Sequence, residues 1–135
     1  MSSKEFEQYK IDYKEDYEKY FSQLYVIGPT DLRGLNHIPL AIGTSNKPQD
    51  VLKALQVNSE LRLTFYTLIK PQATRAALGV IKKIYENRKE AFEWINLDYN
   101  LLSDLKKYGL IKQYEEQALL KKLNKINKVL NQSLI

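Results

Sequence analysis

The hydrophobic positions along most of the chain recur every three or four residues, which is the spacing of one face of an α-helix. This spacing predicts helices over residues 4–25, 50–58, 71–87, 89–108 and 112–133. The segment 59–69 is ambiguous, because its residues 61–69, LRLTFYTLI, also alternate as a strand does. We interpret it as a short helix, since no partner strand is evident elsewhere in the chain.

Residues 26–49 break the helical pattern, because glycine and proline interrupt them repeatedly. The segment is nevertheless rich in leucine and isoleucine, whose side chains need burial. Long connections without regular structure are uncommon inside a compact domain. We therefore expect an extended apolar arm that lies across its own bundle or across a neighbouring subunit.

Together these patterns predict an all-α protein. An N-terminal helix and the extended arm would occupy residues 1–49, and a four-helix-type bundle would occupy residues 50–135. The whole chain has 135 residues, a length typical of one domain.

The charge of the chain is positive and unevenly distributed. Its net charge is +5, and residues 56–90 carry seven cations against three acids. In the helix predicted over 71–87 and just beyond it, Arg75, Lys82 and Lys89 recur every seven residues, close to two helical turns, so they form one stripe. Lys83 and Arg88 flank this stripe. The stripe is either a solvated face or a surface that binds a polyanion.

Basic residues outside this helix add to the picture. Arg33 and Lys47 lie in the extended arm, and Lys121, Lys125 and Lys128 lie on one face of the last predicted helix. That amphipathic helix suits a membrane surface, a partner's groove or an ordinary bundle with a solvated face. The candidate DNA-binding residues are Arg75, Lys82, Lys83, Arg88, Lys89, Arg33 and Lys47.

The hydrophobic face of the first predicted helix is almost wholly aromatic. A stripe that closes a protein's own core usually consists of leucine, isoleucine and valine, whereas tyrosine is favoured at surfaces that a partner covers. We interpret this helix as an interaction arm; the alternative is a helix that closes the domain's own core. The candidate subunit-interface residues are Phe6, Tyr9, Tyr13, Tyr17, Tyr20 and Phe21.

Chemistry-bearing motifs are missing from the sequence. The chain has no cysteine and a single histidine, His37, and it shows no glycine-rich phosphate loop, Ser/His/Asp set or acidic metal cluster. We therefore expect no enzymatic activity, no catalytic residues, no metal and no cofactor. No apolar run approaches the length of a membrane span, and the N-terminus lacks the apolar core of a secretory signal.

The predicted order of parts resembles the major coat proteins of the rod-shaped and filamentous viruses of hyperthermophilic archaea. Three residue pairs add to this resemblance, because they are similar in type and spacing to positions in the rod-shaped virus coat. These pairs are Pro29-Thr30, Val57-Asn58 and Arg75-Ala76. The high tyrosine and lysine content and the lack of cysteine are also similar to proteins of such viruses.

The resemblance implies a structural protein of the virion. Coat proteins of this family dimerise, with themselves or with a paralogue, enclose double-stranded DNA without reading its sequence, and assemble into a helical filament. A lipid envelope surrounds some members, and the resemblance leaves an envelope open here. The net-acidic N-terminal helix departs from the basic arm that a DNA-wrapping coat should have. The alternative hypothesis is a small helical regulator or inhibitor, encoded by a virus or plasmid and located in the host cytoplasm, that acts by protein–protein contact through the tyrosine stripe.

Overall fold

The protein is a mixed α/β fold, as its computed structural model shows, and the all-α prediction is wrong. The structure describes residues 2–14, 20–86, 88 and 94–133. In chain order its elements are α1 (Ser3–Asp12), β1 (Phe21–Pro29), β2 (Pro39–Ser45), α3 (Pro48–Val57), β3 (Leu63–Leu68), β4 (Gln72–Ala73), α4 (Thr74–Tyr85), β5 (Ile95–Asn96), α5 (Tyr99–Lys107) and α6 (Gln113–Ser133).

The strands form one antiparallel sheet in the order β3-β1-β2-β5, and β4 pairs with the first residues of β1. In the β1–β2 pair Tyr25 lies opposite Gly43, and in the β1–β3 pair the register shifts between Val26 and Ile27. The two central strands come from residues 21–45 and their outer neighbours from residues 63–96. The sheet therefore contains strands from both of the predicted regions, residues 1–49 and residues 50–135.

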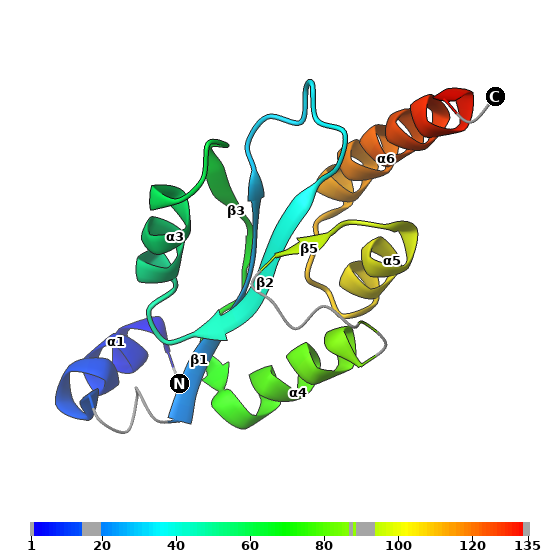
Figure 1. Cartoon of the computed structure of the whole chain (residues 1–135). Helices are drawn as coiled ribbons and strands as arrows, with labels where there is room; N and C mark the ends of the chain where they lie inside the picture. The colour runs from blue at the N-terminus through cyan, green and yellow to red at the C-terminus, as the bar shows by residue number, and fades with distance from the viewer. Residues whose placement is uncertain (1, 15–19, 87, 89–93, 134–135) are drawn as a thin grey trace.

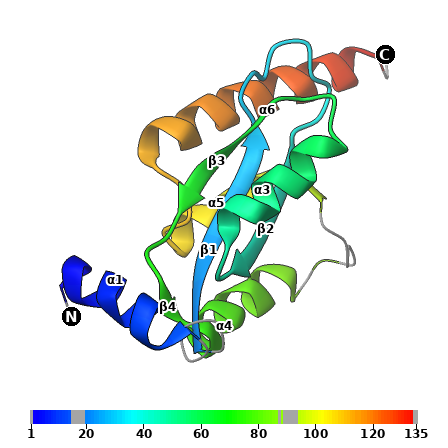
Figure 2. The same ribbon diagram turned by 90° about the vertical axis from the view of Figure 1, so that its left-hand side faces the viewer.

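Helices cover both faces of the sheet (Figure 1). On one face α3 packs over a small cluster that includes Ile27, Ala41 and Leu55. On the other face α4, α5 and α6 cover the main core, to which the sheet contributes Val26 and Leu40. Figure 2 shows α3 in front of the sheet and α6 behind it. The C-terminal part of α6 extends past the sheet in both views.

The helix predicted over residues 4–25 is correct only in its N-terminal part. Helix α1 stops at Asp12, whereas residues 21–25, which the periodicity assigns to the same helix, lie in the sheet. Helices cover both faces of β1, so Leu24 and Ile27 are buried on opposite sides. A strand buried on both faces lacks the alternation of apolar and polar residues that identifies a strand. The helical spacing of its aromatic residues is therefore misleading.

The extended arm predicted over residues 26–49 is instead the end of β1, a loop, and β2. Its apolar side chains are buried within the protein's own core; Ile38 and Leu40 are both fully buried. Gly28, Pro29, Pro39 and Gly43 lie in the strands, whereas Gly34 lies in the loop and Pro48 begins α3. Gly28 faces the ring of Tyr66 and the side chain of Leu40 so closely that a Cβ at this position would force one of them to shift.

The short helix predicted over residues 59–69 is also wrong, because Leu63–Leu68 form β3. The partner of β3 is β1, which precedes it by about forty residues and whose first residues, 21–25, the periodicity assigns to a helix. The backbone N–H and the Oγ1 of Thr30 both donate to the carbonyl oxygen of Arg62, at 2.8 and 3.1 Å. Because the start of β1 is assigned to a helix, the sequence shows no partner strand for β3.

The helices predicted over 50–58, 71–87 and 112–133 are confirmed as α3, α4 and α6, with shifted ends. Helix α4 begins at Thr74 rather than near Pro71, because Gln72 and Ala73 pair with β1. The helix predicted over 89–108 is correct only for α5, because Ile95 and Asn96 form the short strand β5. Gly109 ends α5 as predicted, with a φ of 69° that favours glycine.

Candidate nucleic-acid interface

The basic stripe predicted on the central helix is present on α4 for the residues that the structure describes. Ala77 and Ile84 are buried against the sheet, which fixes the inner side of α4. Arg75, Lys82 and Lys83 are exposed. Lys89, the third member of the predicted stripe, lies outside the described residues.

Arg88 is engaged within the fold rather than directed outward. Its Nη2 donates to Asp104 Oδ2 of α5 at 3.0 Å, and its Nη1 donates to the carbonyl oxygen of Ile84. The side chain is only 13% exposed. Because these contacts join the end of α4 to α5, Arg88 has a structural role here and offers little to a phosphate.

Arg33 lies in the loop between β1 and β2 and pairs with Asp31. Its Nε and Nη2 reach the two carboxylate oxygens at 3.0 and 2.8 Å. The hydrogen bond from Arg33 lowers the pKa of Asp31 to about 2, and the charge of Lys122 on α6 contributes a smaller effect. The Arg33 charge is therefore largely balanced by Asp31, although the side chain is exposed.

Lys47 precedes α3, which lies on the opposite face of the sheet from α4. The predicted DNA-binding residues therefore do not converge on one surface. Arg75, Lys82 and Lys83 share α4, whereas Arg33 and Lys47 lie at separate places.

A second basic stripe lies on α6. Leu119 and Leu123 are buried and Ile126 is half-buried, so the opposite side of this helix faces outward. The exposed side carries Lys121, Lys125 and Lys128. From residue 117 to residue 133 the helix has four lysines and no acidic residue. The sequence periodicity places these three lysines on one face, in agreement with the structure.

Helix α5 adds cations beside these two helices. Lys106 pairs with Glu116 of α6 at 3.5 Å, and the Nζ of Lys107 lies over the ring of Tyr108, 5.5 Å from its centre. The described residues from 74 to 133 carry eleven lysines and arginines against five acids, whereas those before 74 carry eight against six. We call the outward side of α4, α5 and α6 the basic helical layer. Its exposed cations are Arg75, Lys82, Lys83, Lys106, Lys107, Lys121, Lys125 and Lys128.

Some of the aromatic residues predicted as the stripe contact one another, whereas others are exposed. The ring of Phe21 lies edge-on to the rings of Phe6 and Tyr9, with centroids 5.7 Å apart in both pairs. Tyr9 also contacts Tyr13, whose side chain is 56% exposed. No residue of α1 is buried. Tyr20 is exposed, and Tyr17 lies outside the described residues.

Comparison of the chain with protein-family models, curated proteins and solved structures finds no match. No helix among the described residues has the length and apolar character to span a membrane. In the same residues, no three histidine, aspartate or glutamate side chains gather closely enough to hold a metal ion. The charge and geometry of the surface are therefore the observations that bear on function.

Proposed function

We propose that the protein binds double-stranded DNA through sequence-independent contacts between phosphates and the basic helical layer. The observation that carries the proposal is α6, whose residues 117–133 bear four lysines and no acid and whose C-terminal part extends past the sheet. A helix of 21 residues is about 31 Å long, which is close to one turn of the DNA duplex. Its lysines would reach phosphates without inserting a reading element into a groove.

The charge distribution supports the same surface. The layer's cations come from three helices that cover one face of the sheet, and among its described acids Asp104 and Glu116 are paired with Arg88 and Lys106. A cationic surface of this kind raises the local concentration of a polyanion. Neutralising phosphates releases condensed counterions, so binding should weaken steeply as salt rises.

A salt titration of binding to two unrelated duplexes tests this proposal. Two triple variants remove one stripe each: K121Q/K125Q/K128Q on α6 and R75Q/K82Q/K83Q on α4. Each should lower the slope of log affinity against log salt, by about 0.9 for every phosphate that the variant no longer neutralises. The matched control K4Q/K53Q/K70Q removes three exposed charges outside the layer and should leave the slope unchanged. Unchanged slopes for both stripes, or a weakening confined to one duplex, would contradict the proposal.

Coat assembly is a further step beyond DNA binding. The resemblance to coat proteins depends on a helical architecture, and this protein has a mixed α/β fold. Negative-stain microscopy of the protein with linear DNA separates the two possibilities. Filaments of uniform width would extend the proposal to a coat, whereas discrete complexes on the duplex would limit it to DNA binding.

A second candidate function is protein–protein contact through α1, with a second copy of the chain as the partner. The favouring observation is that α1 buries none of its residues, while Ile11 and Tyr13 are 73% and 56% exposed. Replacing both by serine should weaken self-association and leave the thermal stability of the monomer nearly unchanged, because neither side chain closes the core. Light scattering after size-exclusion chromatography measures the first quantity and calorimetry the second.

A further inference from the structure

The loop that joins β1 to β2, residues 30–38, lies beside α6. A cavity of about 140 Å³ between them is lined from one side by Thr30 and Leu32 and from the other by Ala118 and Leu119. In Figures 1 and 2 this loop extends past the end of the sheet next to α6. The loop therefore reaches the helix whose lysines carry the proposed binding of DNA.

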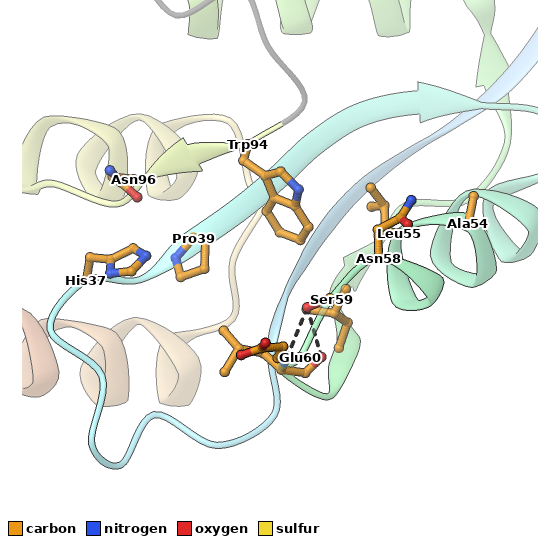
Figure 3. Close-up of a pocket in the computed structure, with 11 residues that line it drawn as sticks. His37, Pro39, Ala54, Leu55, Asn58, Ser59, Glu60, Trp94 and Asn96 are labelled. Atoms are coloured by element: carbon orange, nitrogen blue, oxygen red, sulfur yellow. Dashed lines mark hydrogen bonds between the residues drawn. The ribbon is translucent and has the colours of Figure 1, made fainter.

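The loop contacts α6 through its first half. Leu32 packs against the main core, to which α6 contributes two buried leucines. Figure 3 shows the other end of the loop, where His37 and Pro39 line a hollow of about 530 Å³ beside Trp94 on the α3 side of the sheet. The residues that directly follow β1 are therefore the ones beside α6.

A tight turn places Arg33 at the surface of this first half. The Leu35 N–H donates to the Leu32 carbonyl oxygen at 3.3 Å, so residues 32–35 form a turn with Arg33 and Gly34 at its centre. Gly34 has a φ of 76°, which a type II turn needs at this position. Because Leu32 is anchored against the core, the Arg33 side chain is directed outward, and it is 91% exposed.

Asp31 lies between the Arg33 turn and the lysines of α6. The hydrogen bond from Arg33 is the main cause of the low pKa of Asp31, and the positive charge of Lys122 lowers it further. Lys122 lies one turn beyond Ala118, which lines the shared cavity, and three residues before Lys125 of the basic stripe. Side chains three or four positions apart are neighbours on a helix. The ion pair of Asp31 and Arg33 is therefore at the edge of the α6 stripe.

We propose that this turn extends the duplex-binding surface of α6, and that Arg33 leaves Asp31 to bind a phosphate of the DNA. The inference rests on the proposed function, because it adds a contact to the same surface. A guanidinium matches two oxygens of a phosphate as well as those of a carboxylate, so the phosphate can replace the carboxylate in the same geometry. The exchange costs little, because solvent screens an ion pair this exposed.

Asp31 should then weaken the binding of DNA although it is not itself a DNA contact. Its carboxylate competes with the phosphate for Arg33, and it is the one acid among the loop residues 30–38. Substitutions of the two partners should therefore have opposite effects on affinity. An ion pair with only a structural role would give effects of the same sign, because either substitution removes the same bonds.

Salt titrations of duplex binding with D31N, R33Q and the double variant D31N/R33Q test this inference. R33Q should lower the slope of log affinity against log salt by about 0.9, as expected for the loss of one phosphate contact. D31N should keep the wild-type slope and tighten binding severalfold. In the R33Q background, D31N should change affinity no more than its effect on net charge does. The matched controls D50N and K53Q measure that effect, because they make the same charge changes at exposed positions of α3 on the opposite face of the sheet.

The outcomes separate this inference from the proposed function. If K121Q/K125Q/K128Q lowers the slope while R33Q leaves it unchanged, the loop is not a DNA contact and only the inference is overturned. If D31N tightens binding equally with and without Arg33, the exchange of partners is overturned, because the carboxylate then acts on DNA only through its charge. Failure of the wild-type chain to bind either duplex would overturn both.

Discussion

Thr67 donates a hydrogen bond of 2.6 Å from its Oγ1 to the carbonyl oxygen of Leu110. Both residues are buried, and 43 positions separate them. The bond ties β3, at the edge of the sheet, to the connection between α5 and α6. It therefore helps to fix where α6, with its basic stripe, leaves the body of the protein.

Replacing Thr67 by valine should destabilise the protein. The two side chains have the same shape, but valine leaves the buried Leu110 carbonyl without its partner, at a cost of about 1–3 kcal/mol. Thr67→Ser keeps the hydroxyl and should cost less. Chemical denaturation of the three proteins measures the difference, and equal stability of T67V and the wild type would contradict this role for the bond.

Replacing glycine by alanine should lower the stability of the protein at Gly28 and raise it at Gly79. A Cβ on Gly28 would lie 2.6 Å from the ring of Tyr66 and 2.8 Å from Leu40 Cδ2. The Tyr66 ring cannot withdraw easily, because its hydroxyl donates to the Pro29 carbonyl at 2.5 Å. G28A should therefore cost about 1–3 kcal/mol through overpacking.

The matched substitution G79A should stabilise the protein. Gly79 lies within α4, where a Cβ meets nothing within 4 Å, and alanine favours a helix over glycine by about 0.8–1.0 kcal/mol. Thermal denaturation of both variants measures the two effects. A drop in stability in G79A would show that α4 is not an exposed helix at this position.

The ion pair between Arg88 and Asp104 should contribute more than the pair between Arg33 and Asp31. Arg88 is 13% exposed whereas Arg33 is 91% exposed, so solvent screens the second pair far more. A double-mutant cycle with R88M and D104A should give a coupling energy of about 0.5–3 kcal/mol. The corresponding cycle with R33M and D31A serves as the comparison and should give the smaller coupling energy, because solvent screens that pair more.

Asp31 should titrate well below an ordinary aspartate. The hydrogen bond from Arg33 lowers the pKa of its carboxyl from 3.8 to about 2. A lowered pKa in the folded state stabilises the fold above the unfolded pKa, and this contribution disappears as pH falls from 3.8 towards 2. Carboxyl NMR of the wild type should show the low value, and R33Q should return the Asp31 pKa towards its ordinary range. An unchanged Asp31 pKa in R33Q would show that Arg33 is not the cause of the low value.

The sequence alone is sufficient to predict the helices that cover the sheet. Helices α3, α4 and α6 each bury one side and expose the other, so their hydrophobic residues repeat with helical spacing. Gly109 ends α5 for a local reason, since its positive φ favours glycine. The stripes of Arg75 and Lys82 on α4 and of Lys121 and Lys125 on α6 follow from the same spacing.

The tertiary structure decides everything that depends on pairing between distant segments. Strand β1 is recognisable only beside β2 and β3, and burial on both faces removes the alternation that would have identified it. The engagement of Arg88 with Asp104 and the hollow beside Trp94 likewise join residues that no local pattern connects. Local periodicity records which side of a segment is buried, but only the folded chain determines which segments cover it.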